Sequence, residues 1–165
     1  MNSFTRFVLL ALSVCCSTLV VACGSSSSPQ NADASKDIQA FIGTWAVTSG
    51  TVTLDCGGQI TTAQVTDPTT WMKGTTSDLV QPPDSSGCAL QATVSGRTAT
   101  AEPNQTCSQQ AAGNSVVITL AMYTFVVGSD QTTASEQGMG TAVVKDTTTR
   151  DCTYSEKATY KKSSP

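Results

Sequence analysis

The sequence contains no histidine, and its 165 residues are poor in charged and aromatic side chains. Charged residues make up 13% of the chain and aromatic residues 5%. Without histidine the chain lacks the commonest general base and the commonest metal ligand. Its lysines and arginines are scattered apart from the pair Lys161-Lys162, and the formal net charge is −3. The composition therefore predicts no basic surface for nucleic acid.

Motifs that activate a catalytic side chain are also missing. The chain has no GxSxG, no SxxK and no CxxC, and the oxygen spacing of a calcium loop is absent around Asp146 and Asp151. The carboxylates of Glu136 and Glu156 could in principle work as an acid–base pair. No motif surrounds them, however, and we expect both to be solvated strand positions. The sequence thus predicts no catalytic residue, no metal, no cofactor and no enzyme activity.

Residues 1–22 have the layout of an export signal. Arg6 precedes the uncharged stretch FVLLALSVCCSTLVV, which is shorter than the roughly 20 apolar residues that a spanning helix needs. The stretch runs into LVVAC, residues 19–23, which resembles the lipobox of bacterial lipoproteins. That resemblance implies removal of the signal and acylation of Cys23, whose several acyl chains hold a bilayer better than one. The alternative is a secretory signal cut near Ala22, with a free thiol after it.

A lipobox implies a place in the bacterial cell envelope. Residues 23–38 would then be the acylated cysteine and a flexible Ser-rich tether, and residues 39–165 a single all-β domain. Gly24-Ser25 resembles the start of lipoproteins that move on to the outer membrane, facing the periplasm or the cell surface. The expected partners are the lipid bilayer, through acylated Cys23, and an envelope protein or a small apolar ligand.

Four cysteines remain in the predicted domain: Cys56, Cys88, Cys107 and Cys152. An even number in an exported domain suggests two disulfides, with three possible pairings. Cys88 and Cys107 bracket a predicted hairpin. Cys56 and Cys152 lie in the expected first and last strands, which become neighbours if the sheet closes. We therefore predict the disulfides Cys88–Cys107 and Cys56–Cys152.

The domain has the pattern of β-structure throughout. Threonine and valine are frequent, no apolar repeat has helical spacing, and turn signals divide the chain into short segments. We predict about eight antiparallel strands in a meander, forming a barrel or a closely packed sandwich. The first strand is expected at residues 44–56, where a bulge near Ser49 and Gly50 would place Trp45 and Val47 on the face of the later apolar residues. A Ser-Gly hairpin is the alternative.

A second register can be read around residues 95–96. If these form a two-residue turn, Ala92 faces Ala99 and Leu90 faces Ala101, so that apolar residues pair across the strands. The following segment, NSVVITLAMYTFVVG, is the most apolar, with one face formed by Val116, Ile118, Leu120 and Met122.

Two further strands complete the predicted sheet. One contains Gly138 and Gly140, whose missing side chains would allow sharp curvature. The last strand, residues 150–162, places Cys152, Tyr154, Ala158 and Tyr160 on one face. The predicted core is drawn from all these strands and consists of Trp45, Val47, Leu54, Leu90, Val116, Ile118, Leu120, Met122, Tyr154 and Tyr160.

The triplet Gly43-Thr44-Trp45 resembles the start of the first strand in lipocalins and in avidin-type barrels. The resemblance covers only these residues. It implies an eight-stranded barrel whose Trp45 packs across the closed end, under a basic residue of the last strand such as Lys157 or Lys161. Two functions stay open: a structural or interaction module of the cell envelope, or a lipocalin-like binder of a small apolar ligand. An apolar cavity of roughly 300 Å³ or more would favour the binder.

Overall fold

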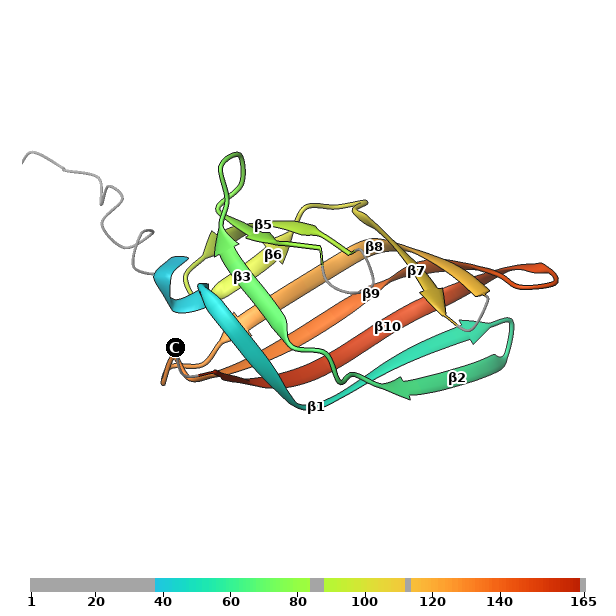
Figure 1. The fold of residues 1–165 in the computed structure, drawn as a ribbon, viewed down its shortest axis with the longest axis horizontal. Coiled ribbons are helices and arrows are strands. Elements are labelled where there is room, and N and C mark those ends of the chain that lie inside the picture. Colours follow the sequence, from blue (N-terminus) through green and yellow to red (C-terminus); the bar gives the residue numbers. More distant parts are fainter. Residues whose placement is uncertain (1–37, 84–87, 112–113, 164–165) are drawn as a thin grey trace, which may run out of the picture. The chain divides into compact units, whose positions relative to one another are not determined.

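The computed structural model describes residues 38–83, 88–111 and 114–163, which belong to one compact unit. After a helical turn at residues 38–41, these residues form strands (Figure 1), with the bounds β1 Gly43–Cys56, β2 Gln59–Gln64, β3 Thr69–Lys73, β4 Leu79–Gln81, β5 Leu90–Ser95, β6 Thr98–Ala101, β7 Thr106–Ala111, β8 Asn114–Val127, β9 Thr133–Lys145 and β10 Thr149–Lys162. The predicted signal, Cys23 and the tether up to residue 37 lie outside the described residues. In the part that is described, no helix has the length and apolar character to cross a membrane.

Eight of these strands close into an antiparallel barrel. Their hydrogen-bonded order is β10-β9-β8-β6-β5-β4-β3-β1, and β1 pairs with β10 to complete the ring. Apart from the closing pair of β1 and β10, neighbours in the ring follow one another in the sequence, with only β2 and β7, which lie outside the ring, between some of them. The predicted all-β barrel is confirmed, and the sandwich alternative is not the fold that forms.

The strands β2 and β7 lie outside the ring and lengthen the sheet on one side of it. β1 pairs with β3 near Trp45 but with β2 along residues 51–56. β8 pairs with β6 at residues 124–126 but with β7 at residues 114–119. Beyond the ring the sheet thus continues as β2-β1-β10-β9-β8-β7, with β2 and β7 as its two edges (Figure 1).

A bulge in β1 confirms the prediction made for this strand. The pairing of β1 with β10 shifts between Val47 and Ser49, so the strand bends here and no Ser-Gly hairpin forms. Gly50 follows directly. A Cβ on Gly50 would lie 2.8 Å from the Cβ of Ala158, so a glycine is what allows β1 to approach β10 this closely.

A second bulge, in β8, was not predicted. The pairing of β8 with β9 shifts between Leu120 and Met122, and the inward face passes from Leu120 to Tyr123 and Phe125. The prediction of one continuous face from Val116 to Met122 is therefore wrong beyond Leu120. Met122 is only partly buried.

The hairpin of β5 and β6 has the predicted faces but a different register. Ala92 pairs with Ala101, so the predicted pairings of Ala92 with Ala99 and of Leu90 with Ala101 are wrong. The turn lies one residue later, at residues 96–97, because Gly96 takes the positive φ of 56° that such turns need. Moving the turn by one residue shifts the pairing of the two strands by two residues, and a two-residue shift keeps every side chain on its face. The predicted inward residues are accordingly all buried: Leu90, Ala92, Ala99 and Ala101.

The core contains every aromatic side chain of the described residues. These are Phe41, Trp45, Trp71, Tyr123, Phe125, Tyr154 and Tyr160. Among the predicted core residues, the buried ones are Trp45, Leu90, Ile118, Leu120, Tyr154 and Tyr160. Val47, Leu54 and Val116 are partly buried at its edge. Phe125 is the centre of an aromatic cluster that the sequence did not reveal.

Trp45 packs in that cluster at the end of the ring where the described chain begins. Its ring meets Phe125 edge-on, with the centroids 5.4 Å apart, and its indole N–H donates to the carbonyl of Phe41 at 2.8 Å. The Nζ atom of Lys162 lies 5.2 Å from the centroid of the Trp45 ring and donates to the carbonyl of Ala40 at 2.9 Å. The basic residue over Trp45 is therefore Lys162 rather than Lys157 or Lys161.

Both predicted disulfides are present. Cys56–Cys152 joins residues of β1 and β10 that face each other across the closure of the ring, with the Cα atoms 4.1 Å apart. Cys88–Cys107 ties the segment that leads into the β5–β6 hairpin to β7, with the Cα atoms 4.6 Å apart. The two bonds thus hold the first long strand to the last and one edge strand to the ring.

Candidate functional site

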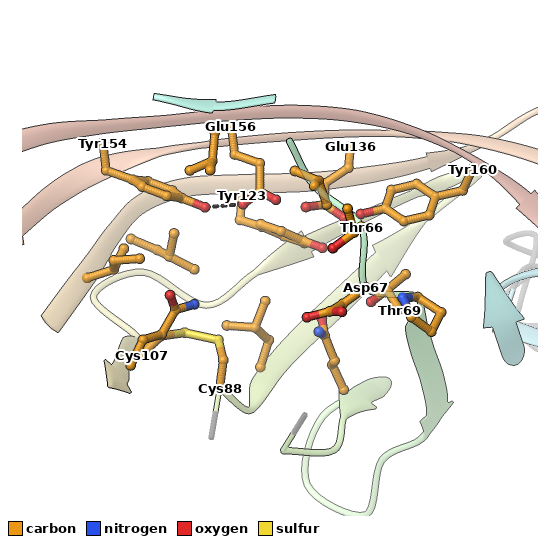
Figure 2. A pocket seen from close by; sticks show the side chains of 18 of the residues that line it. Thr66, Asp67, Thr69, Cys88, Cys107, Tyr123, Glu136, Tyr154, Glu156 and Tyr160 are labelled. Atoms are coloured by element: carbon orange, nitrogen blue, oxygen red, sulfur yellow. Dashed lines mark hydrogen bonds between the residues drawn. A yellow bond between two sulfur atoms is a disulfide. The ribbon is translucent and has the colours of Figure 1, made fainter. Parts of the chain in front are cut away.

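A cavity of about 250 Å³ lies inside the barrel, where the ring gives way to the six-stranded extension. Inward-facing side chains of both parts line it (Figure 2). Part of the wall is apolar and comes from Leu90, Ile118 and Leu120. The polar part gathers around a carboxylate of β9, Glu136, with Tyr123, Tyr154, Glu156 and Tyr160 beside it (Figure 2).

Glu136 is buried, with 7% of its surface exposed. Along β9 the inward positions alternate, so that Ala134, Glu136 and Gly138 all face the interior. Its pairing partners are Phe125 on β8 and Ala158 on β10. The prediction that Glu136 is a solvated strand position is therefore wrong.

The surroundings of Glu136 shift its pKa toward neutrality. Burial raises the pKa of Glu136 to about 7, and the nearby carboxylate of Glu156 adds to the rise. Hydrogen bonds from Tyr160 and Tyr123 act in the opposite direction, because they favour the charged form. Near neutral pH the Glu136 carboxyl can therefore be either protonated or ionised, depending on what enters the cavity.

The tyrosine hydroxyls in this cavity act as donors to carboxylates. The Tyr154 hydroxyl donates to Glu156, as Figure 2 shows. Burial raises the pKa of Tyr123, Tyr154 and Tyr160 above the usual range, and the neighbouring glutamates raise it further. All three hydroxyls therefore keep their protons at neutral pH.

Gly138 lies next to two of these rings. It pairs with Tyr123 on β8 and with Glu156 on β10. A Cβ on Gly138 would lie 3.5 Å from the rings of Tyr123 and Tyr154, which is ordinary van der Waals contact. The packing of the tyrosines therefore does not require a glycine at this position.

Two buried polar atoms in the cavity wall have no hydrogen-bond partner in the described structure. They are Oγ1 of Thr69, a residue that is 5% exposed, and Oε1 of Gln81. A buried polar atom without a partner costs free energy and needs a physical explanation. The Thr69 hydroxyl can donate or accept a hydrogen bond and the Gln81 oxygen can accept one, but less than 1 Å² of either atom is accessible.

The charge of the cavity wall has one sign. Its carboxylates come from Glu136, Glu156 and the exposed Asp67, and no lysine or arginine is found among its described residues. Within the same described ranges, no group of three His, Cys, Asp or Glu side chains is arranged to hold a metal ion. The site is therefore an acidic cavity without a metal-binding cluster in the described chain.

The parity of Glu136 and Glu156 along their strands indicates that both carboxylates face the interior. Glu136 has the same parity as Gly138 and Gly140, which were predicted to curve the sheet. Glu156 has the same parity as Tyr154 and Ala158, which were placed on one face. Strict alternation along both strands would have put the two glutamates inside the barrel.

Comparison with protein-family models, with curated proteins and with solved structures finds no match to the chain. Its function therefore has to be inferred from the geometry and chemistry of the cavity.

Proposed function

We propose that the chain is a lipid-anchored protein of the bacterial cell envelope that binds a small polar ligand in its barrel cavity. The observation that carries the proposal is the carboxylate of Glu136, which is 7% exposed and lines a cavity of about 250 Å³. Burying a carboxylate costs free energy unless it is paired or hydrogen-bonded. A purely structural module has no need of such a group beside an open space, whereas a ligand in that space can pair with it.

The size and lining of the cavity favour a ligand that is small and polar. A volume of about 250 Å³ corresponds to about eight water molecules at their liquid volume, below the roughly 300–1,000 Å³ of pockets for drug-sized ligands. An apolar ligand would remove water from Glu136 and Glu156 without replacing its hydrogen bonds, which is unfavourable. We therefore favour a polar ligand over the apolar one that the lipocalin resemblance suggested.

The anchor is supported by the lipobox-like residues 19–23, and the disulfides fit an oxidising compartment outside the cytoplasm. We expect Cys23→Ser to move the protein from the membrane fraction to the soluble fraction, because the acylated side chain is lost. Ser26→Ala, in the same segment, is the control and should stay in the membrane fraction. A Cys23→Ser protein that remains with the membranes would contradict the anchor.

Ligand binding can be tested with the full-length protein extracted in mild detergent. Native mass spectrometry should show a bound small molecule, or its uptake from a metabolite extract. Thr66→Trp should abolish this binding, because Thr66 is exposed and lines the same cavity as Glu136 and Tyr160 (Figure 2). Thr141→Trp, at an exposed position on the outer face of β9, is the matched control. If the unmodified protein neither retains nor takes up a small molecule, the structural role is correct and the binding proposal is wrong.

A further inference from the structure

We propose that β2 is a dimerisation edge, along which two copies of this chain pair their β2 strands antiparallel about a two-fold axis at Thr62. The inference goes beyond the proposed ligand site and does not depend on what the cavity binds. It is carried by the exposure of β2, by the direction of its backbone groups and by its lack of charge.

β2 is an open edge of the sheet. Among the described strands it pairs with β1 alone, and it stands at the end of the six-stranded extension (Figure 1). All six of its side chains are exposed, and because side chains alternate along a strand, they include both faces. Ile60, at 66%, is the most exposed large apolar side chain of the described residues. The described chain therefore leaves β2 open to a neighbouring strand.

The backbone of β2 alternates between groups bonded to β1 and groups directed outward. The N–H of Val65 donates to the carbonyl of Gly50 on β1 at 3.1 Å. In an antiparallel pair every second residue exchanges hydrogen bonds with the partner strand, and the residues between them direct N–H and C=O the other way. Counting back from Val65, the residues with outward groups are Gln64, Thr62 and Ile60. Unpaired groups of this kind are a template for another strand.

These outward groups are placed symmetrically about Thr62. When two β2 strands run antiparallel with Thr62 opposite Thr62 of the second copy, Ile60 lies opposite Gln64 of the second copy, and the reverse pair forms on the other side of the axis. Each of these pairs exchanges two hydrogen bonds. Every outward donor and acceptor of β2 thus finds a partner, and the exposed Ile60 packs against the stem of a glutamine.

The composition of β2 favours a second copy as its partner. Edge strands are commonly protected by charged side chains, proline or bulges. The strand QITTAQ has no charge and no proline, and its pairing with β1 has no shift of register. A two-fold axis brings like residues together, so a charged strand would repel its own copy, whereas an uncharged one does not. Nothing in β2 would select instead a strand of opposite charge.

The size of the contact predicts a weak dimer. A strand of six residues is about 20 Å long, and one pair of such strands buries less than the roughly 1,200–2,000 Å² of stable complexes. Two copies held on one membrane by acylated Cys23, as proposed above, would meet at a much higher effective concentration than in solution. We therefore expect dimers in membranes and in concentrated solution, and monomers in dilute detergent.

Cysteine cross-linking of the full-length protein in lipid vesicles tests this pairing. Thr62→Cys should form a disulfide-linked dimer under mild oxidation, because Cα atoms facing each other in a hydrogen-bonded pair are about 5.5 Å apart, which a disulfide can span. Ile60→Cys is the register control, since its Cα atoms would be about 14 Å apart along the paired strands. Thr141→Cys, exposed on the outer face of β9, controls for random collisions. Thr62→Cys should cross-link at least about tenfold faster than either control.

Thr62→Pro tests the outward hydrogen bonds and leaves those to β1 in place. The N–H of Thr62 points outward, and proline is tolerated at an edge position of this kind. In sedimentation equilibrium of concentrated full-length protein in detergent, Thr62→Pro should associate at least about tenfold more weakly than the unmodified protein. Thr62→Val keeps the N–H and should associate normally. If Thr62→Pro does not fold, as judged by its urea transition, Thr62→Lys takes its place, because it sets two like charges opposite each other.

The outcomes are separate from those for the ligand site, and the detergent experiment does not depend on the anchor. If Thr62→Cys links no faster than Thr141→Cys, and the unmodified protein stays monomeric at every concentration, β2 is not a dimerisation edge. If Ile60→Cys links as fast as Thr62→Cys, the axis at Thr62 is wrong. Species larger than a dimer would show that β2 pairs with a different edge such as β7, because that arrangement does not close.

Discussion

Replacing Gly140 by alanine should destabilise the barrel strongly, whereas the same change at Gly138, on the same strand and face, should not. Gly140 pairs with Leu120 at the bulge of β8. A Cβ on Gly140 would lie 2.0 Å from the carbonyl oxygen of Thr119 and 3.0 Å from its carbonyl carbon. Because both are backbone atoms of a central strand, β8 itself would have to move. A Cβ on Gly138 would meet side-chain atoms, the nearest at 3.5 Å.

The two substitutions should change the free energy of unfolding by different amounts and in different directions. Overpacking that forces a backbone shift costs about 1–3 kcal/mol, and sometimes more. Since the contact at Gly140 is with backbone, we expect a loss of about 3 kcal/mol there. At Gly138 a buried methyl contributes about 0.8 kcal/mol, and alanine lowers the entropy of the unfolded chain by a further 0.4–1 kcal/mol, roughly. Gly138→Ala should therefore be neutral or slightly stabilising.

Urea and thermal unfolding of the two variants, with the disulfides intact, measure this difference. For a domain of this size 1 kcal/mol corresponds to about 4 °C in Tm, so Gly140→Ala should melt about 12 °C below the unmodified protein. Neither glycine has a positive φ, so the backbone conformation is not a confounding factor. A Gly140→Ala protein as stable as the original would refute the close approach of β8 and β9 at the bulge. Equal losses at both positions would refute the steric explanation.

Three further predictions concern stability. The free energy of unfolding should fall as pH rises from 4.5 to about 7, because folded Glu136 keeps a proton that the unfolded chain releases. Urea titrations across that range should show this fall, and Glu136→Gln should flatten it. A rise in the free energy of unfolding would show that folded Glu136 is ionised. Removing Cys56–Cys152 should cost about 5 kcal/mol and removing Cys88–Cys107 about 3 kcal/mol in the chain-entropy account, since the bonds span 96 and 19 residues; denaturant unfolding of the two double-alanine variants should preserve this order. Lys162→Met should cost about 1–2 kcal/mol by removing the charge over Trp45 and the hydrogen bond to Ala40, whereas the exposed neighbour Lys161→Met should have no effect on the same urea transition.

Local signals in the sequence were sufficient for much of the barrel. Alternation and turn residues placed β1 within one residue of its bounds, and two sets of opposite parity around Ser49 indicated its bulge. The cysteines contributed long-range information, because pairing Cys56 with Cys152 requires the first and last strands to be neighbours. That requirement is what distinguishes a closed ring from an open sheet, and the observed pairing of β1 with β10 meets it.

The parts that could not be predicted are those in which alternation carries no information. β8 is apolar on both faces, so an extra residue near Ala121 leaves no trace in the pattern. A two-residue slip of the β5–β6 hairpin preserves every face, so only the φ of Gly96 decides the register. Trp71 and Leu79 lie in strands of five and three residues, which are too short for a periodic signal. The prediction for Glu136 was wrong for another reason: no motif surrounds this residue, so it was assigned to the solvated face although its parity is that of an inward position.

The pairing of β1 with β10 also brings the two ends of the described chain together, since Ser163 donates its N–H to the carbonyl of Thr44 and Lys162 contacts Ala40. Residues next to this closure line the cavity as well: Thr69 pairs with Trp45, and Tyr160 pairs with Val47. Separation of the chain ends would therefore open the cavity wall at the same time.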